Sequence, residues 1–298
     1  MKKIKLFFLI IFFITKTNGF AVNEQDSLAL IALYDAADGE VWLGPDDEVI
    51  WLVNERPVRD WFGVTIEHDR VVGLSLPECQ LQGTLPEELG NLSELRVLNL
   101  SENQLSGQLP SSFLNMDKLV SINLSGNYFS GVLPQSLELL PELVEFNIGF
   151  NNFKGNIPPK IGNLTKLRYL ILNNNKLEGS VPFDIGNAVS LRTIDLSSNK
   201  LAGFIPSSIE GLRGLHELYL NDNKFVGTFP DVFRFLVELE VLEIQNNAFV
   251  GIFPKNVQFA DRMRTLNVNN NALDRNGLAD LEGIFIHYTY KKQKRVHQ

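Results

Sequence analysis

The stretch from Leu95 to Pro110, LRVLNLSENQLSGQLP, decides the fold, because its pattern returns every 24 residues along most of the chain. Its glycine recurs from Gly83 to Gly251 and its proline from Pro86 to Pro254, with no insertion in the register. Its asparagine recurs at Asn103, Asn127, Asn151, Asn175, Asn199, Asn223, Asn247 and Asn271. A fixed period of this length predicts a repeat architecture in which each period is one structural unit.

Each part of the repeat has a physical role. Pairs such as Leu98 and Leu100 alternate with polar residues, which predicts a short strand with one buried face. The recurrent Asn lies between apolar positions, so we expect its side chain to point inward and to bond the backbone of the neighbouring turn. The glycine permits a positive φ, and the proline starts a short helical return. No turn buries its apolar face alone, so the turns must stack.

The composition is that of a folded protein, with 44% hydrophobic and 21% charged residues. Eight of the 27 basic residues lie in the first 21 or the last eight residues, which leaves 19 basic against 35 acidic side chains between them. This acidic body disfavours nucleic-acid binding, because phosphate contacts need a basic face, and it favours a basic partner. The single cysteine, Cys79, excludes an intrachain disulfide and a cysteine-rich zinc site.

Residues 1–21 combine a basic start, an apolar run from Leu6 to Ile14 and small residues near Gly19. This pattern predicts a secretory signal peptide, and the alternative is a membrane anchor that stays attached. The apolar run is too short to span a bilayer, and no later segment holds eighteen consecutive apolar residues. We therefore expect a secreted, extracellular chain whose mature form has no transmembrane anchor.

The repeat resembles the plant-type leucine-rich repeat of receptor-kinase ectodomains and polygalacturonase-inhibiting proteins. Residues 71–274 carry nine copies; Cys79 takes the asparagine position in the first, and the ninth lacks the following Gly and Pro. The resemblance implies an α/β solenoid, a right-handed superhelix with a concave parallel β-sheet and short convex helices.

Residues 22–70 resemble the N-terminal cap of the same family, through a helically spaced segment followed by Trp42, Trp51 and Trp61. The plant pattern usually places two cysteines where this chain has Arg59 and Ile66, so packing must hold the cap, with the tryptophans as anchors. Cys79 is expected to be a buried, unreactive thiol. Residues 275–298 are expected to form a C-terminal cap and a basic tail, which is solvated or touches an anionic surface.

Aromatic and acidic side chains cluster on the solvent-facing strand positions of the fourth to eighth turns. Exposed rings beside charges are typical of protein-binding surfaces. The predicted ligand-binding residues are Glu145, Phe150, Tyr169, Ile171, Asp195, His216, Glu217, Tyr219, Asp222 and Glu243. Alternatively, these are ordinary variable surface positions, and a partner binds along an edge of the solenoid.

Four N-x-S/T sequons begin at Asn91, Asn99, Asn123 and Asn163 and are candidate glycosylation sites. The sequence contains no phosphate-binding loop, zinc-protease motif or serine-hydrolase motif. Carboxylates on an open sheet are a poor catalytic pair, because they lack an enclosing pocket. We expect no enzyme activity, no cofactor and no metal site, and the oligomeric state stays open.

The leading hypothesis is a secreted, non-catalytic recognition module that binds a protein, peptide or glycan on its concave face. The resemblance implies this function, since the periodicity indicates only the scaffold. Inhibition of a secreted polysaccharide-degrading enzyme is a narrower version. We do not expect a full receptor kinase, because no transmembrane helix or kinase motif is present.

Two other functions stay open. The alternative of a different class is a structural or adhesive component of the cell surface or wall. Ice binding is the third hypothesis; it would need long, uniform columns of Thr or Ser, which Ile171, Tyr219 and Glu243 interrupt.

Overall fold

The computed structural model describes residues 22–51, 53, 55–274 and 287–289, which divide into two units after Ser130. The first unit comprises the described residues up to Ser130, and the second comprises those from Gly131 onward. The predicted signal peptide lies outside the described residues, as does most of the predicted C-terminal cap with its basic tail.

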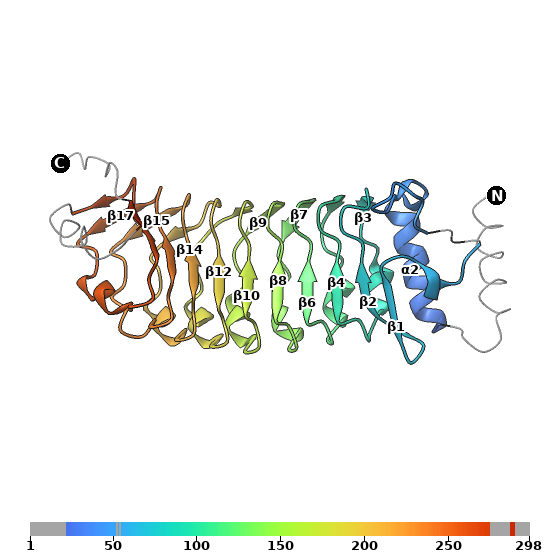
Figure 1. Ribbon diagram of the computed structural model, residues 1–298, viewed down its shortest axis with the longest axis horizontal. Helices are drawn as coiled ribbons and strands as arrows, with labels where there is room; N and C mark the ends of the chain where they lie inside the picture. Colours follow the sequence, from blue (N-terminus) through green and yellow to red (C-terminus); the bar gives the residue numbers. More distant parts are fainter. Residues whose placement is uncertain (1–21, 52, 54, 275–286, 290–298) are drawn as a thin grey trace. The chain divides into compact units, whose positions relative to one another are not determined.

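The first unit begins with helix α2 (Glu24–Ala36), drawn in blue in Figure 1. Asn23 caps its N-terminus: the side-chain oxygen accepts hydrogen bonds from the backbone N–H groups of Gln25 at 2.9 Å and Asp26 at 3.3 Å. The helix ends at Ala36, shortly before Asp38 adopts a left-handed φ of 57°. Its buried residues are Asp26, Ser27, Ala29, Leu30, Ile31 and Leu33.

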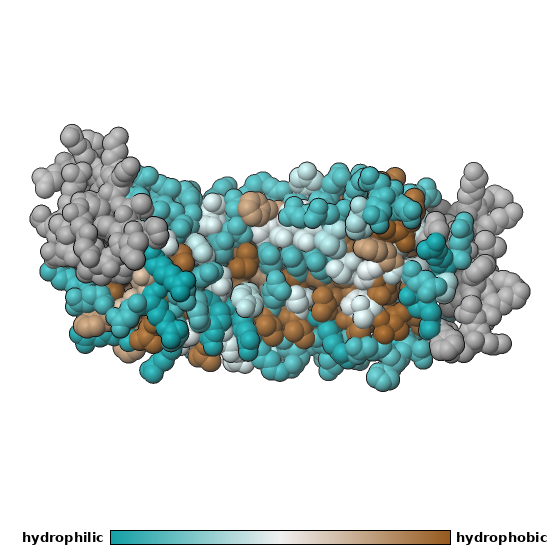
Figure 2. Space-filling view, viewed as in Figure 1, coloured by the Kyte–Doolittle hydropathy of each residue, from teal (hydrophilic) through white to brown (hydrophobic). Residues whose placement is uncertain are grey.

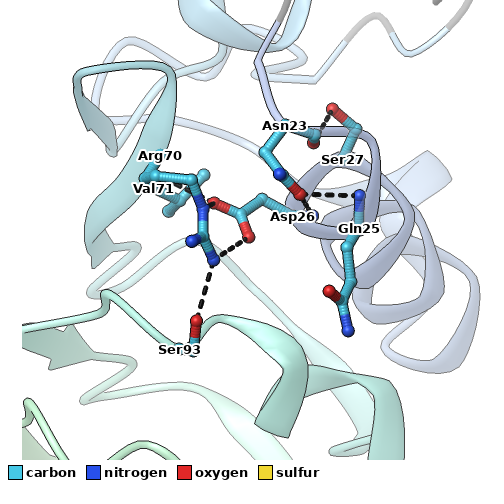
Figure 3. A network of polar contacts seen from close by, with 7 residues as sticks. All are labelled: Asn23, Gln25, Asp26, Ser27, Arg70, Val71 and Ser93. Atoms are coloured by element: carbon cyan, nitrogen blue, oxygen red, sulfur yellow. Dashed lines mark hydrogen bonds and ion pairs between the residues drawn. The ribbon is translucent and has the colours of Figure 1, made fainter.

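An ion pair between a buried carboxylate and a partly exposed guanidinium joins α2 to the strand that follows the cap (Figure 3). The Asp26 carboxylate is fully buried, and its two oxygens accept hydrogen bonds from Nε and Nη2 of Arg70, both at 3.0 Å. The backbone N–H of Val71 donates to the same carboxylate at 2.8 Å, and Arg70 also donates to the Ser93 hydroxyl at 2.9 Å. The hydrogen bond to Asp26 is the main cause that raises the pKa of Arg70.

The strands of the first unit form a main sheet and a flanking sheet, joined by short 3-10 helices. The main sheet has the order β1-β2-β4-β6, of which only the first pair is antiparallel: β1 (Val64–Glu67), β2 (Arg70–Ser75), β4 (Val97–Asn99) and β6 (Ser121–Asn123). The flanking sheet contains β3 (Gln82–Thr84), β5 (Gln104–Gly107) and β7 (Tyr128–Val132). The 3-10 helices are η1 (Gly39–Val41), η2 (Val58–Asp60), η3 (Glu87–Asn91) and η4 (Ser111–Asn115).

The three tryptophans anchor the cap, as the sequence predicts. Trp42, Trp51 and Trp61 are 0%, 1% and 3% exposed, and the centroids of successive rings lie 4.9 and 4.6 Å apart. Each indole N–H donates to a backbone carbonyl oxygen, so no ring leaves an unpaired donor in the core. Cys79 is buried, and burial raises the pKa of its thiol to about 11, which disfavours the reactive thiolate.

The second unit repeats the same turn. Its main sheet is parallel, in the order β8 (Glu145–Asn147), β10 (Tyr169–Ile171), β12 (Thr193–Asp195), β14 (Glu217–Tyr219), β16 (Val241–Glu243), β18 (Thr265–Asn267) and β20 (His287–Thr289). Its flanking strands are β9 (Asn152–Gly155), β11 (Lys176–Leu177), β13 (Ala202–Gly203), β15 (Lys224–Gly227), β17 (Ala248–Gly251) and β19 (Ala272–Leu273). The returns include η5 (Leu137–Leu139), η6 (Pro159–Asn163), η7 (Phe183–Asn187), η8 (Ser207–Gly211) and η9 (Lys255–Phe259).

The inward orientation of the repeat asparagines is confirmed, and Asn175 is representative. Its Nδ2 donates to the carbonyl oxygens of Ile148 at 2.9 Å, Leu172 at 3.2 Å and Asn173 at 3.2 Å. Its Oδ1 accepts from the backbone N–H of Phe153 at 2.9 Å. One side chain therefore joins two successive turns through four backbone groups that are otherwise hard to satisfy in the interior.

The strand alternation and the turn glycines also agree with the sequence analysis. In β4, Leu98 is fully buried, whereas Val97 is 41% exposed and Asn99 is half-buried. The eight repeat glycines have φ between 75° and 92°, a region that other residues adopt only with strain. Asn199 is half-buried, the one repeat asparagine outside the buried class, and it makes the same set of backbone bonds.

Candidate functional site

The main sheet of the second unit brings six of the predicted binding residues onto neighbouring strands. Ile171, Asp195, Tyr219 and Glu243 occupy the same register position on β10, β12, β14 and β16. Tyr169 starts β10, and Glu217 occupies the matching position on β14, two strands away. We call this group the acidic–aromatic patch: Tyr169, Ile171, Asp195, Glu217, Tyr219 and Glu243.

The patch lies on an open sheet face. Tyr169 is 44% exposed, and the other five members are half-buried, since each strand residue leans against its neighbours across the sheet. Figure 2 looks onto this sheet, and over the second unit the surface is mostly hydrophilic with small hydrophobic areas. Glu145 lies beside Tyr169 in register, on β8, so it borders the patch.

Carboxylates surround Tyr219. The pKa of Tyr219 is raised to about 12, first by burial and then by the charges of Glu217, Glu243 and Asp195. The phenol therefore stays a neutral hydrogen-bond donor at any physiological pH. Burial also raises the pKa of Asp195, with smaller contributions from the charges of Glu243 and Glu217, against hydrogen bonds from Ser197 that favour its ionised form.

Asp195→Asn is expected to raise the melting temperature slightly at neutral pH. The folded-state pKa of Asp195 is raised, so its contribution to stability is full below the ordinary aspartate pKa and is lost as pH rises through the folded value. An asparagine keeps the acceptor for Ser197, as Asn267 does for Asn269. Thermal melts should show the advantage of the variant at neutral pH and its loss below about pH 3.5; an advantage of equal size in acid would contradict this.

Phe150 occupies a strained position beside the sheet. Its φ is 54°, in the left-handed region where a bulky residue is an outlier, and such residues cost about 1–3 kcal/mol. The equivalent positions of the other turns in the second unit are Asn174, Ser198, Asp222, Asn246 and Asn270. Because its ring is 58% exposed, its burial offsets little of this cost.

Two of the predicted residues have other contacts. The Asp222 carboxylate accepts hydrogen bonds from the side-chain amides of Asn221 and Asn246, both at 2.7 Å. Nδ1 of His216 lies 2.8 Å from the carbonyl oxygen of Gly214, which fixes the ring just before β14. Both lie at the border of the acidic–aromatic patch rather than within its strands.

The turns differ at the end of the main-sheet strand in a way that the repeat pattern did not predict. In several turns, the Asn or Asp that ends the main-sheet strand accepts a hydrogen bond from the residue two positions on, as Asn99 does from Ser101. The strands β10, β14 and β16 end instead with Ile171, Tyr219 and Glu243. In the described residues, the turns after these strands leave three buried side-chain oxygens without a partner, those of Asn173, Asn221 and Gln245. The sequence contains a signal for this difference, because an amide residue stands two positions after each of Ile171, Tyr219 and Glu243.

The four sequons occupy different settings. Asn99 and Asn123 lie on main-sheet strands, and each side-chain oxygen accepts from the serine two residues on. Asn91 and Asn163 end the 3-10 helices η3 and η6, and Asn163 is exposed. Glycosylation at all four stays a prediction.

Two features are absent from residues 22–51, 53, 55–274 and 287–289. No helix in this part of the chain is long and apolar enough to cross a bilayer. In the same residues, no three His, Cys, Asp or Glu side chains are grouped closely enough to hold a metal ion.

Comparison with known families identifies the repeat. The family described as a leucine-rich repeat region matches residues 149–281, and a second, described as a leucine rich repeat, matches residues 70–129 and 93–153. Together the matches run from residue 70 to residue 281.

Three similar solved structures are informative. The plant peptide hormone receptor RGFR1, in complex with RGF2, is 32% identical with a TM-score of 0.63 over 67% of this chain and 32% of the receptor. The ectodomain of the Arabidopsis thaliana receptor kinase GASSHO1/SCHENGEN3, in complex with CASPARIAN STRIP INTEGRITY FACTOR 2, is 26% identical with a TM-score of 0.73 over 83% of this chain and 33% of that one. A plant ice-binding protein is 25% identical with a TM-score of 0.68 over 85% of this chain and 88% of its own.

The chain spans about a third of the length of the two receptor chains. The α/β solenoid turn described above, with one parallel strand, an inward asparagine and a return to the next strand, agrees with these matches. The chain belongs to the leucine-rich repeat family and is a plant-type leucine-rich repeat protein.

Proposed function

We propose that this protein is a secreted, non-catalytic recognition module that binds a peptide or protein ligand on the exposed face of the main sheet of its second unit. The observation that carries the proposal is the acidic–aromatic patch, in which Tyr169 and Tyr219 lie among carboxylates on neighbouring parallel strands. Tyrosine is enriched among the residues that dominate binding energy at protein interfaces.

The charge of the patch selects the ligand. Asp195, Glu217 and Glu243 face an open surface, and a ligand that brings a lysine or arginine side chain relieves their mutual repulsion. The raised pKa of Asp195 means that its charge is kept at the expense of stability, which is expected of a group retained for binding. The receptors RGFR1 and GASSHO1/SCHENGEN3, whose structures contain RGF2 and CASPARIAN STRIP INTEGRITY FACTOR 2, support a peptide ligand.

Replacing Tyr169 and Tyr219 together by alanine is expected to abolish partner capture while the fold is kept. Each ring at a binding hot spot contributes about 2 kcal/mol or more, so the loss of both should weaken binding by about 4 kcal/mol, which is about 1,000-fold. The measurement is a pull-down from an extracellular extract of the source organism with wild type and variant side by side, followed by mass spectrometry and titration of the recovered partner.

Tyr128→Ala is the matched control, because Tyr128 is 60% exposed and lies on the flanking sheet of the first unit. It should retain the partner, and both variants should melt close to wild type. Equal recovery by the double variant would move the binding surface away from the patch. Recovery of a polysaccharide-degrading enzyme in the same experiment would identify the narrower inhibitor function.

Secretion is tested separately. The acid-free, apolar start of the chain supports cleavage of residues 1–21 during export. N-terminal sequencing of the mature protein should begin near Ala21 or Val22. An intact Met1 on protein recovered outside the cell would contradict cleavage.

A second candidate function is ice binding, favoured by the plant ice-binding protein whose match spans most of both chains. We rank it below ligand recognition, because Ile171, Tyr219 and Glu243 break the uniform column that a flat lattice of water would contact. Thermal hysteresis of the purified protein, compared with a heat-unfolded sample, measures it. A freezing gap in the folded sample alone would reverse the ranking.

A further inference from the structure

A shallow hollow lies where the flanking strands of the second unit meet the 3-10 returns. Its volume is about 240 Å³, below the roughly 300–1,000 Å³ of pockets that hold drug-sized ligands, so it suits one ring-sized group. None of its lining residues belongs to the acidic–aromatic patch. They come from two consecutive turns and include Asn156, Ile157, Pro159, Ser180, Phe183 and Asp184.

The hollow has an apolar part with an aromatic platform. Phe183 begins η7 and is 68% exposed, which is unusual for a large apolar side chain, while Ile157 is only 2% exposed. The hydroxyl of Ser208 donates to the carbonyl oxygen of Phe183 and so fixes the backbone that carries the ring. Pro159 begins η6 and contributes a second rigid apolar surface.

The hollow also has polar groups with free hydrogen-bonding capacity. The amide of Asn156 lies against the neighbouring turn, where a β-carbon built on Gly179 would come within 2.5 Å of its Oδ1. In the described part of the chain, the side chains of Asn156, Ser180 and Asp184 make no hydrogen bond or ion pair with protein groups. All three are exposed, so their donors and acceptors are available to a ligand.

Other turns use these positions differently. In the first unit, Glu87 accepts hydrogen bonds from the backbone N–H groups of Ser111 and Ser112 at 3.0 and 2.9 Å, which ties η3 to η4. In the second unit, the side-chain amide of Asn256 donates to the carboxylate of Asp231. The returns that begin at Pro159 and Phe183 lack such a link between their side chains and instead leave the hollow between them.

We propose that this hollow binds one neutral pyranose residue of a glycan. The ring of Phe183 offers a flat apolar surface to the C–H face of the sugar, and Asn156, Ser180 and Asp184 offer donors and acceptors to its hydroxyl groups. Asp184 is the ionisable member of the seven lining residues, and its negative charge accepts hydrogen bonds from hydroxyl groups while it repels a uronate or sulfate. The site is independent of the ligand proposed for the main sheet.

The test is binding of neutral and acidic tetrasaccharides, measured by saturation-transfer NMR and calorimetry on the full chain. Cellotetraose, xylotetraose and mannotetraose are the neutral probes, and tetragalacturonic acid is the acidic one. At least one neutral probe should bind with millimolar affinity, and the acidic probe should bind more weakly. Phe183→Ala should weaken the neutral probe about tenfold, through loss of the stacking surface.

Phe204→Ala is the matched control. Phe204 is also 68% exposed, but its ring lies over Gly227 on the flanking sheet and does not line the hollow. This variant should bind the sugar as wild type does, and Asn156→Ala should bind it more weakly. Failure of all three neutral probes to bind, equal loss in the two phenylalanine variants, or tighter binding of tetragalacturonic acid would each overturn the proposal.

Discussion

Replacing Asp26 by alanine is expected to lower the free energy of unfolding of the first unit by about 3 kcal/mol, the lower end of the usual effect of removing one partner from a buried ion pair, because the Arg70 side chain is 27% exposed and water solvates part of its charge. The carboxylate has no exposure and receives three hydrogen bonds, two from Arg70 and one from the backbone N–H of Val71. Alanine leaves the guanidinium without its counter-charge and the N–H of Val71 without an acceptor. It also removes the hydrogen bonds that link α2 to β2 through Asp26.

Urea unfolding of wild type and Asp26→Ala measures this difference, with the slope of the transition checked for a change in the surface that unfolds. Glu67→Ala is the matched control, because Glu67 pairs with Arg96 at 2.8 Å but the two side chains are 47% and 48% exposed. An exposed pair contributes at most about 1 kcal/mol, so this variant should change little. If both variants lost the same stability, burial of Asp26 would not be the reason for its importance.

Replacing Asn175 by leucine is expected to lower the stability of the second unit by about 3 kcal/mol. Leucine has the same number of heavy side-chain atoms and the same branching, but no polar group. It leaves the N–H of Phe153 and the carbonyl oxygens of Ile148, Leu172 and Asn173 without the bonds that the amide makes. Each buried group left unpaired costs about 1–3 kcal/mol, and relaxation of the turn recovers part of the sum.

Asn152→Leu is the control for this change, since Asn152 follows the ladder residue Asn151 in the chain but is half-buried on β9, outside the ladder. Its melting temperature should stay within a few degrees of wild type, whereas Asn175→Leu should fall by about 6–12 °C. A melting temperature of Asn175→Leu equal to that of the control would show that the ladder contributes no net stability.

The sequence predicts the structural features that recur in every repeat, but it does not predict contacts that occur only once. The spacing of Leu98, Asn175 and the turn glycines predicts strand, ladder and turn correctly, because every turn solves the same packing problem. Asp26 and Arg70 are 44 residues apart and belong to no period, so their pairing needed the structure. The hollow was not predicted for the same reason, because Phe183 and Asn156 occupy different repeat positions in adjacent turns.

The candidate binding residues were predictable as exposed positions but not as partners. The strand register alone places Tyr219 between Asp195 and Glu243. The hydrogen bond from Asn246 to Asp222 depends on the left-handed backbone of Asp222, which no sequence motif predicts. Cys79 is a further instance. A ladder asparagine bonds the turn before it, and no repeat turn precedes the first repeat, so a small apolar side chain fits at position 79. The backbone N–H of Cys79 still donates to the side-chain oxygen of Asn103 in the next turn.

The ladder asparagines, of which Asn175 is representative, bond backbone atoms of their own turn and of the preceding turn, and this separates the scaffold from the surface that it displays. Any turn can follow any other without loss of a ladder bond. Removal of one whole period, such as residues 176–199, would join Asn175 to Lys200 in register and shorten the main sheet by one strand. Such a chain can therefore change its ligand, its length and the spacing of its contact residues by exchange of modules, while the interior stays the same.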